Sequence, residues 1–415
     1  MTTHRPRTPT PAPRRAQPRT RQAQRVDQAL LRSSNLALVA RTVFAADPSP
    51  TRADVATATS MTRSTVSRLV DDLVAGGVLR ELTRVVGPGP GRPGTPLAPG
   101  TDRFVALGLQ VNVGYLAALV VDLSGTVLAQ HLVTDDLRGS APAPVLERLV
   151  GLAAAALAEL PQARVLVGAG LALPGIVSAG SGTLLRAPNL GWSDLDVAGL
   201  VDRDRLRGAA VTIGNEADLA SATVTRTRPG HPSPLQDVIY LSGETGIGGT
   251  VVVDGESMHG RHGWAGEIGH VTVDPAGPAC PCGSTGCLEQ YAGKRALLAA
   301  AGLAPEAPAS QLADAVRAGA AGPRSAVDRA AWALGVALAG VVNVVDVPSV
   351  VLGGHLRELA DVLRPRLEQT LRERVLSARW VTPTVEPSGP GAAPGALGAA
   401  YLELERVVAD PAVWL

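Results

Sequence analysis

The three cysteines of this 415-residue chain are confined to eight residues, at Cys280, Cys282 and Cys287, and His270 lies ten positions before the first of them. Three thiolates and one imidazole are a common tetrahedral ligand set for zinc. In a protein of the cytosol, clustered cysteines favour metal binding over disulfide formation. Because four protein ligands leave no position for water, we expect a structural zinc ion here and not a hydrolytic one. A buried cluster of reduced cysteines is the alternative.

The composition is that of a soluble protein whose core is built from small side chains. Apolar residues make up 46% of the chain but aromatic residues only 3%, so Ala, Val, Leu and Gly must fill the core. No stretch approaches the roughly 18 consecutive apolar residues of a membrane span, and the N-terminus lacks the apolar segment of a signal peptide. The length suggests two or three domains, and we expect a cytoplasmic protein.

Charge is distributed unevenly along the chain. Residues 1–100 contain 15 arginines and 6 acidic residues, although the net charge of the whole chain is only +1. A basic N-terminal part joined to an acidic body is typical of a nucleic-acid-binding module attached to a second domain. Residues 1–25 are rich in Pro, Thr and Arg and contain no acidic residue. We expect them to be disordered, either as a basic arm that contacts DNA or as a tail without a function.

Residues 26–98 have the pattern of a small α+β winged helix-turn-helix domain. Apolar residues at helical spacing over 36–43 predict a first helix. Thr51 is placed to cap a second helix, and Thr62 to cap a third that runs to Ala75 and stops at a Gly-Gly pair. The apolar side chains of the third helix lie on one face, which leaves a polar face that begins at the helix N-terminus.

The polar face of this third helix is the candidate DNA-reading surface. Short hydroxyl side chains reach phosphates and arginines reach guanine when a helix lies in the major groove. Strands predicted over 79–86 and 95–97 flank a Gly/Pro-rich wing, whose arginine is placed to enter the minor groove. The alternatives are a solvated amphipathic helix and an ordinary linker. The candidate DNA-binding residues are Thr62, Arg63, Ser64, Thr65, Ser67, Arg68 and Arg92.

The body of the chain contains the same order of elements twice. Three strands are predicted over 104–134, followed by a helix over 145–160 and a strand over 165–173. A second set of strands begins at 238 and is followed by helices. Such an order is typical of a duplicated α/β architecture with two lobes.

The segment from Cys280 to Glu289 resembles the signature of the ROK family (repressors, open reading frames and sugar kinases). It has the pattern Cys-x-Cys-Gly-x-x-Gly-Cys-x-Glu. Supporting segments are Leu173-Pro174-Gly175, residues 187–192, Asn215-Glu216-Ala217 and residues 243–249. The resemblance covers about residues 30–405. It implies the actin-like (ribonuclease-H-like) two-lobed ATPase fold, with a first lobe over 101–225, a second lobe over 226–415 that holds the zinc site, and a C-terminal helix that returns to the first lobe.

The resemblance also implies a sugar site between the lobes. Carboxylates, amides and imidazoles suit this role because they accept and donate hydrogen bonds to neighbouring hydroxyls. The zinc site would hold His270 and Glu289 in place from behind. The sugar-binding residues implied by the family are Asn189, Asn215, Glu216, Glu267, His270 and Glu289.

The positions that carry phosphoryl transfer in the kinases of this family are changed here. The metal-directing Asp of their Asp-x-Gly-Gly-Thr loop corresponds to Gln110, and the Gly-Gly-Thr to residues 112–114, where Val113 adds bulk. The base, an Asp, is replaced by Glu216; moving a base by about 1 Å costs on the order of a hundredfold in rate. Glu244 adds negative charge where a nucleotide phosphate would lie. We therefore expect no catalytic residue and no enzyme.

Together these features predict a sugar-responsive DNA-binding transcriptional regulator, a repressor of carbohydrate-utilisation genes. Its partners would be operator DNA and a sugar or sugar phosphate, and we expect a homodimer on a pseudo-palindromic site. One alternative is an ATP-dependent, glucokinase-like sugar kinase with a DNA-binding head. Another is a DNA-binding protein whose sugar site is vestigial.

Overall fold

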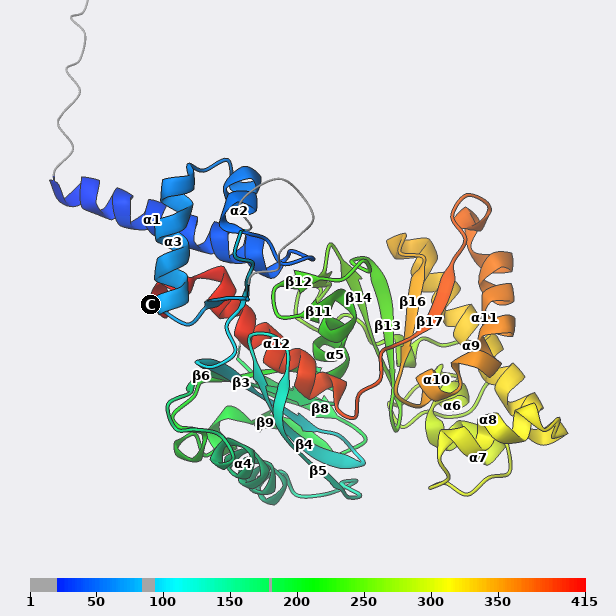
Figure 1. Cartoon of the computed structure of the whole chain (residues 1–415). Helices are drawn as coiled ribbons and strands as arrows, with labels where there is room; N and C mark the ends of the chain where they lie inside the picture. The colour runs from blue at the N-terminus through cyan, green and yellow to red at the C-terminus, as the bar shows by residue number, and fades with distance from the viewer. Residues whose placement is uncertain (1–20, 84–93, 179–180) are drawn as a thin grey trace, which may run out of the picture.

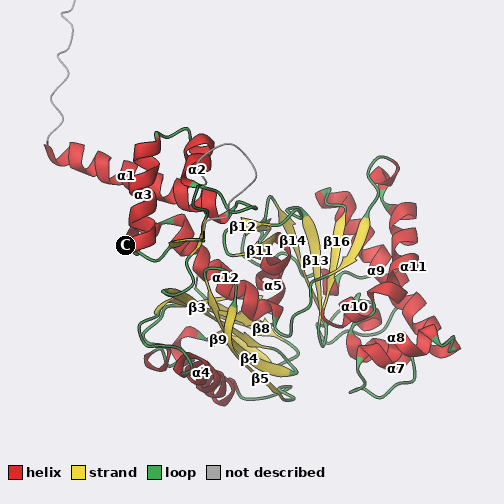
Figure 2. Ribbon diagram, viewed as in Figure 1, coloured by secondary structure: helices red, strands yellow, loops and turns green. Residues whose placement is uncertain are grey.

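The computed structural model describes residues 21–83, 94–178 and 181–415, which form a small N-terminal head on a body of two lobes (Figure 1). Each lobe is built around a five-stranded sheet. Helices cover the sheets, and the long C-terminal helix α12 (Pro394–Ala409) runs from the lobes to the head (Figure 2).

The head is a helix-turn-helix domain whose helices begin at the predicted caps. Thr51 forms a capping box with Asp54 at the start of α2, and the Thr62 hydroxyl accepts a hydrogen bond from the Thr65 N–H at the start of α3. Strands β1 and β2 pair antiparallel and form the base of the wing. The elements of the head are α1 (Arg21–Phe44), α2 (Arg52–Thr59), α3 (Arg63–Ala75), β1 (Leu79–Glu81) and β2 (Leu97–Pro99).

Two boundaries of the head differ from the sequence-based expectation. Helix α1 begins at Arg21, so the end of the arm predicted to be disordered over 1–25 is helical; residues 1–20 are outside the described part of the chain. Strand β1 ends at Glu81, and residues 84–86 of the strand predicted over 79–86 are outside the described part of the chain. Arg92, predicted to contact DNA, is also outside the described residues.

The first lobe contains a sheet of order β10-β6-β3-β4-β5. Strands β3 to β5 form the predicted antiparallel meander, and β6 and β10 extend the sheet in parallel. Alternate residues of β3 face opposite sides: Val105 packs towards helix α4, and Phe104 towards α12. The bounds are β3 (Phe104–Val111), β4 (Tyr115–Asp122), β5 (Val127–Thr134), α4 (Pro142–Ala158), β6 (Val165–Leu173) and β10 (Val211–Asn215).

The second lobe repeats this topology with the order β15-β14-β13-β16-β17. When the strands of each lobe are counted along the chain, both sheets read third, second, first, fourth, fifth. The repeat confirms the predicted duplicated architecture and the actin-like fold class. The bounds are β13 (Val238–Gly243), β14 (Ile247–Val253), β15 (Glu256–Ser257), α6 (Glu289–Ala292), α7 (Lys294–Ala300), α8 (Ala309–Arg317), α9 (Ala321–Val345), β16 (Ser349–Gly353), α10 (Gly354–Glu358), α11 (Ala360–Arg374) and β17 (Thr384–Pro387).

Helices α5 (Glu216–Thr225) and α12 pack against each other between the two sheets. They approach closely at Gly398, where a Cβ atom would collide with the backbone oxygen of Leu219. Helix α12 also lies on β3 and β6, so the C-terminal helix packs on the sheet of the first lobe. Short strands complete the body: β7 (Ile176–Val177), β8 (Thr183–Ala187), β9 (Trp192–Asp196), β11 (Arg226–Arg228) and β12 (His231–Pro232).

The hydrophobic core of the head is continuous with the core beneath α12. Phe44 of the head, Phe104 of the first sheet and Leu404 of α12 are fully buried in one cluster. The ring of Trp414, near the C-terminus, meets Phe104 edge-on with 6.0 Å between ring centroids. Because cores are close-packed, a shift of α12 must be felt in the head.

Helix α9 is long and apolar enough to cross a membrane by length and composition alone. However, 61% of its most apolar window is buried inside the protein. Its alanines and leucines pack against the helices and strands of the second lobe. This burial is typical of a core helix, as expected for the apolar run over 334–345.

Candidate functional site

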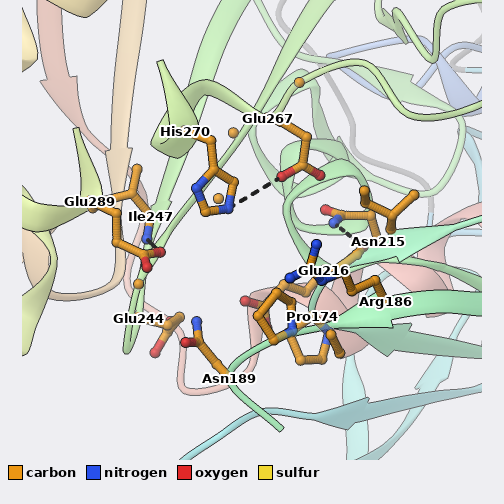
Figure 3. A pocket seen from close by; sticks show the side chains of 18 of the residues that line it. Pro174, Arg186, Asn189, Asn215, Glu216, Glu244, Ile247, Glu267, His270 and Glu289 are labelled. Atoms are coloured by element: carbon orange, nitrogen blue, oxygen red, sulfur yellow. Dashed lines mark hydrogen bonds and ion pairs between the residues drawn. The ribbon is translucent and has the colours of Figure 1, made fainter. Parts of the chain in front are cut away.

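A cavity of about 320 Å³ lies between the two lobes (Figure 3). The first lobe contributes residues from the loops after β3, β6 and β8 and from the junction of β10 with α5. The second lobe contributes the β13–β14 turn and the loop that leads to the cysteine cluster. The structure brings all six of the predicted sugar-binding residues to the walls of this one cavity: Asn189, Asn215, Glu216, Glu267, His270 and Glu289.

Asn215 fixes the start of helix α5 at the cavity. Its Oδ1 accepts hydrogen bonds from the N–H groups of Ala217 and Asp218, at 2.7 and 3.3 Å. Its Nδ2 donates a 2.8 Å hydrogen bond to the backbone oxygen of Gly175. Most of the hydrogen-bonding capacity of this amide is therefore used within the protein, and one Nδ2 hydrogen remains for a ligand.

Glu216 is buried and is held by two amides from strand β3 and the turn that follows. Its Oε2 accepts hydrogen bonds from Asn112 Nδ2 at 3.0 Å and from Gln110 Nε2 at 3.3 Å. Burial raises the pKa of Glu216 to about 7, against the opposing effect of these two donors. Gln110 in turn accepts a 3.1 Å hydrogen bond from the backbone N–H of Ala396, at the start of α12.

The β13–β14 turn brings a second buried carboxylate to the cavity. Burial raises the pKa of Glu244 to about 8, and the nearby Glu216 adds to the shift. Directly after this turn, at the start of β14, the N–H of Ile247 donates a 3.0 Å hydrogen bond to Glu289 Oε2. A Cβ atom at Gly246 would collide with the Glu289 carboxylate, so glycine at this position lets the turn close over it.

The cysteine cluster borders the cavity and has the geometry of a tetrahedral metal site. The ligand atoms of His270 and the three cysteines all lie within 4.8 Å of one another. Cys282 Sγ and Cys287 Sγ are 3.7 Å apart, close to the roughly 3.8 Å between two sulfurs bound to one zinc ion at about 2.3 Å each. This donor set and spacing therefore fit zinc.

The two ring nitrogens of His270 face different partners. Nδ1 lies 3.9 Å from Cys280 Sγ, and Nε2 lies 3.9 Å from Glu267 Oε2 (Figure 3). A metal bound at Nδ1 leaves Nε2 protonated and pointing to the sugar-binding wall. The two roles that the sequence predicted for this histidine are thus compatible.

Helix α3 presents most of its predicted DNA-binding residues at the surface. Arg63, Ser64 and Arg68 are exposed. Within the described part of the chain, neither arginine forms an ion pair or hydrogen bond with another residue. Thr62 is committed to the helix cap, with hydroxyl contacts of 3.0 Å to Ser64 and 2.8 Å to Thr65.

Sequence reasoning did not place Asn112, Arg186 or Asp218 at the sugar-binding cavity, although all three line it. Asn112 was considered only as a lost phosphate-loop residue. Arg186 and Asp218 directly flank segments that carried the family resemblance, so their proximity in the sequence was the available signal.

The comparisons with known families divide the chain at the same place as the fold. A family model described as the IclR helix-turn-helix domain matches residues 42–82, and one described as the ROK family matches residues 106–406. The chain belongs to the ROK family. It joins a helix-turn-helix domain to a ROK domain, which is the organisation of a sugar-responsive DNA-binding regulator.

Relatives of this ROK protein include repressors and kinases. It is 26% identical to the xylose repressor of Caldicellulosiruptor bescii, over 86% of this chain and 92% of that protein. It is 25% identical to the xylose repressor of Bacillus subtilis, over 92% and 97% of the two chains. The glucokinase of Halalkalibacterium halodurans is 32% identical, but the match covers only 49% of this chain and 66% of the kinase.

Solved structures of ROK proteins share the fold. A ROK family transcriptional regulator, a homologue of the Escherichia coli MLC protein, superposes with a TM-score of 0.72 at 21% identity, over 92% of this chain and 97% of that one. A ROK glucokinase from Streptomyces griseus, in complex with glucose and AMPPNP, superposes with a TM-score of 0.60 at 27% identity, over 72% and 98%. The likeness to the regulator extends over the head as well as the lobes.

Proposed function

We propose that this ROK protein represses carbohydrate-utilisation genes and is released from, or recruited to, its operator by a sugar in the interlobe cavity. The observation that carries the proposal is the gathering of six hydroxyl-binding side chains around one cavity, in a chain whose head presents Arg63 and Arg68. The xylose repressors that match most of the chain support it.

The cavity serves binding and not phosphoryl transfer. Gln110 and Asn112, at the positions of the kinase phosphate loop, both donate to Glu216. A side chain committed to such a network is not free to direct a metal ion. The glucokinase relative favours the alternative of a kinase with a DNA-binding head. Release of ADP from ATP and magnesium in the presence of a panel of hexoses and pentoses would support that alternative, and we expect none above background.

Sugar binding in the cavity is transmitted to the head through helix α12. Its first turn is hydrogen-bonded to Gln110, which holds Glu216 at the cavity. Its other end contacts helix α1, where Arg41 donates to the backbone oxygen of Ala409 at 3.2 Å. A sugar that binds the open and closed lobes with different affinity shifts α12, and hence the head, between two positions.

His270 and the three cysteines hold a structural zinc ion in this proposal. The ion would cross-link the loop before α6 and so fix Glu289 and the imidazole on the sugar-binding wall. It would contribute folding stability and ligand orientation, and no reaction step.

The protein acts as a homodimer in this proposal. One recognition helix reads one half-site, and the helix-turn-helix proteins that bind palindromic operators place two such helices about one helical turn of DNA apart. Light scattering after gel filtration measures the mass directly, and about 85 kDa is expected for twice the 42.4 kDa chain.

An operator titration tests the proposed function. Genomic fragments retained by the purified full chain are labelled, and their binding is followed by fluorescence anisotropy with and without each sugar of a broad panel. At least one sugar should change the apparent affinity by fivefold or more, the lower end of typical allosteric coupling. If no sugar changes the operator affinity, the proposal is contradicted. The protein would then bind DNA constitutively, and its sugar site would be vestigial.

A further inference from the structure

Arg186 places an exposed side chain at the sugar cavity, and no side-chain partner is found for it within residues 21–83, 94–178 and 181–415. It lies on β8, the middle strand of a three-stranded sheet, and pairs with Ile176 of β7 and Ser193 of β9. Its side chain lines the cavity. Among the described residues it forms no hydrogen bond or ion pair through its side chain, although several carboxylates line the same cavity. The base of the side chain is therefore fixed by the sheet, while the guanidinium is available to a ligand in the cavity.

Arg186 lies on one side of the cavity, and the carboxylates of Glu244 and Glu289 lie on the other (Figure 3). Figure 3 shows it beside Pro174 and Asn215, on the side of the cavity away from Glu244 and Glu289. A sugar ring held between the two sides would direct one substituent to this guanidinium. The carboxylates and amides that line the rest of the cavity can already bind the hydroxyl groups of the sugar. A planar fork of N–H donors is matched best by an acceptor with two anionic oxygens.

We propose that Arg186 binds an anionic substituent of the effector, the phosphate of a sugar monophosphate or the carboxylate of a sugar acid. The effector is then an anionic sugar and not a neutral pentose or hexose. The inference rests on the proposed function, because it names the chemical class of ligand for the same cavity.

The carboxylates of the cavity oppose an anionic ligand less than their number suggests. Glu244, whose pKa is about 8, is largely protonated at neutral pH, and Glu216, whose pKa is about 7, is protonated about half of the time. Glu216 is also covered by two amide donors from Gln110 and Asn112. Asp218, Glu267 and Glu289 line the same cavity. The positive charge of Arg186 therefore faces five carboxyl groups, of which Glu216 and Glu244 carry less than their full formal charge.

Calorimetric titration of the full chain with matched sugars tests the proposal. The panel contains neutral pentoses and hexoses, their phosphate monoesters, the corresponding uronic acids, and inorganic phosphate alone. We expect at least one anionic sugar to bind tenfold or more tightly than its neutral parent. Arg186→Gln should remove that advantage and leave the affinity of the neutral parent within about twofold, since a hydrogen-bonded charge pair contributes at least a factor of ten. The phosphate and carboxylate arms show which anion is recognised.

Matched variants keep the outcomes separate. Arg186→Lys retains the charge without the fork and should retain part of the preference. Arg364→Gln, an exposed arginine on α11 outside the cavity, should bind as the unmodified protein does. Neutral sugars that bind as tightly as anionic ones, an unchanged anion affinity in Arg186→Gln, or inorganic phosphate that binds as tightly as the sugar phosphate would overturn the proposal. If neither neutral nor anionic sugars bind, the proposed function itself fails.

Discussion

Asn112 Nδ2 donates a 3.0 Å hydrogen bond to Glu216 Oε2 and so ties the end of the first strand of the body to the start of helix α5. Gln110 donates to the same oxygen and accepts from the first turn of α12. The β3 segment, the cavity and the C-terminal helix therefore meet at one buried carboxylate.

The first prediction is that this carboxylate makes folding stability fall as pH rises. The pKa of Glu216 is raised from 4.5 to about 7 in the folded protein. The folded state therefore binds more protons than the unfolded state between these values, and this contribution is present at low pH and lost as pH rises to about 7. A shift of this size corresponds to about 3 kcal/mol. Urea unfolding between pH 4.5 and pH 8, with Glu216→Gln as the comparison, measures it.

Glu216→Gln should be less sensitive to pH than the unmodified protein over this interval. The difference between the two curves reports the titration of Glu216 together with its coupling to Glu244, whose pKa Glu216 helps to raise. Parallel curves would mean that Glu216 is ionised in the folded protein throughout, in spite of its burial.

The second prediction concerns the cysteine cluster. Cys282→Ser should lower the metal content from one zinc ion per chain to near zero and weaken sugar binding, because Glu289 lies two residues beyond Cys287 and is oriented by the same loop. Elemental analysis of the purified protein and calorimetry with its sugar measure the two effects. Ser284→Ala is the matched control, since Ser284 contributes only backbone groups to the cluster: its oxygen accepts from the N–H of Cys280, and its N–H donates to Cys282. Full zinc content in Cys282→Ser would contradict the assigned ligand set.

The third prediction is that Arg68→Ala weakens operator binding without changing sugar affinity. Arg68 is exposed on α3. A base contact should cost about 1–3 kcal/mol, and a phosphate contact should instead reduce the salt dependence of binding by about one unit. Anisotropy titrations at several salt concentrations distinguish the two. Arg364→Ala, on the second lobe, should leave both quantities unchanged; loss of sugar binding in Arg68→Ala would indicate misfolding.

Local patterns predicted the elements of this fold because they depend on near neighbours. The caps at Thr51 and Thr62, the strand β6 and the duplicated strand order were all visible as spacing of apolar and capping residues. The six sugar-binding residues came from family resemblance, and the structure places them around one cavity. The spacing of residues along the sequence could not have predicted that Asn189 of the first lobe lies near Glu289 of the second lobe.

What the sequence did not reveal depends on contacts between distant segments. The link from Gln110 to Ala396 joins residues 286 positions apart, and no local pattern marks it. Arg186 was overlooked because an isolated arginine in a strand is usually a solvated side chain. Only the fold shows that this strand borders the cavity, and so gives the arginine a role to test.

The last prediction is that Arg228→Met uncouples the sugar from the DNA. Arg228 Nη2 donates to the backbone oxygens of Phe44 and Ala46, at 3.2 and 3.0 Å, where helix α1 ends. The same strand, β11, is tied to α12, because Arg226 Nε donates to Glu405 Oε1 at 2.6 Å. Methionine keeps much of the apolar stem but removes the charged donors from the end of α1. Sugar affinity should be unchanged, since Arg228 does not line the cavity, whereas the sugar-induced change in operator affinity should shrink by severalfold. Anisotropy titrations with saturating sugar measure this ratio, with Arg364→Met as the control. An unchanged ratio would mean that the signal bypasses this contact.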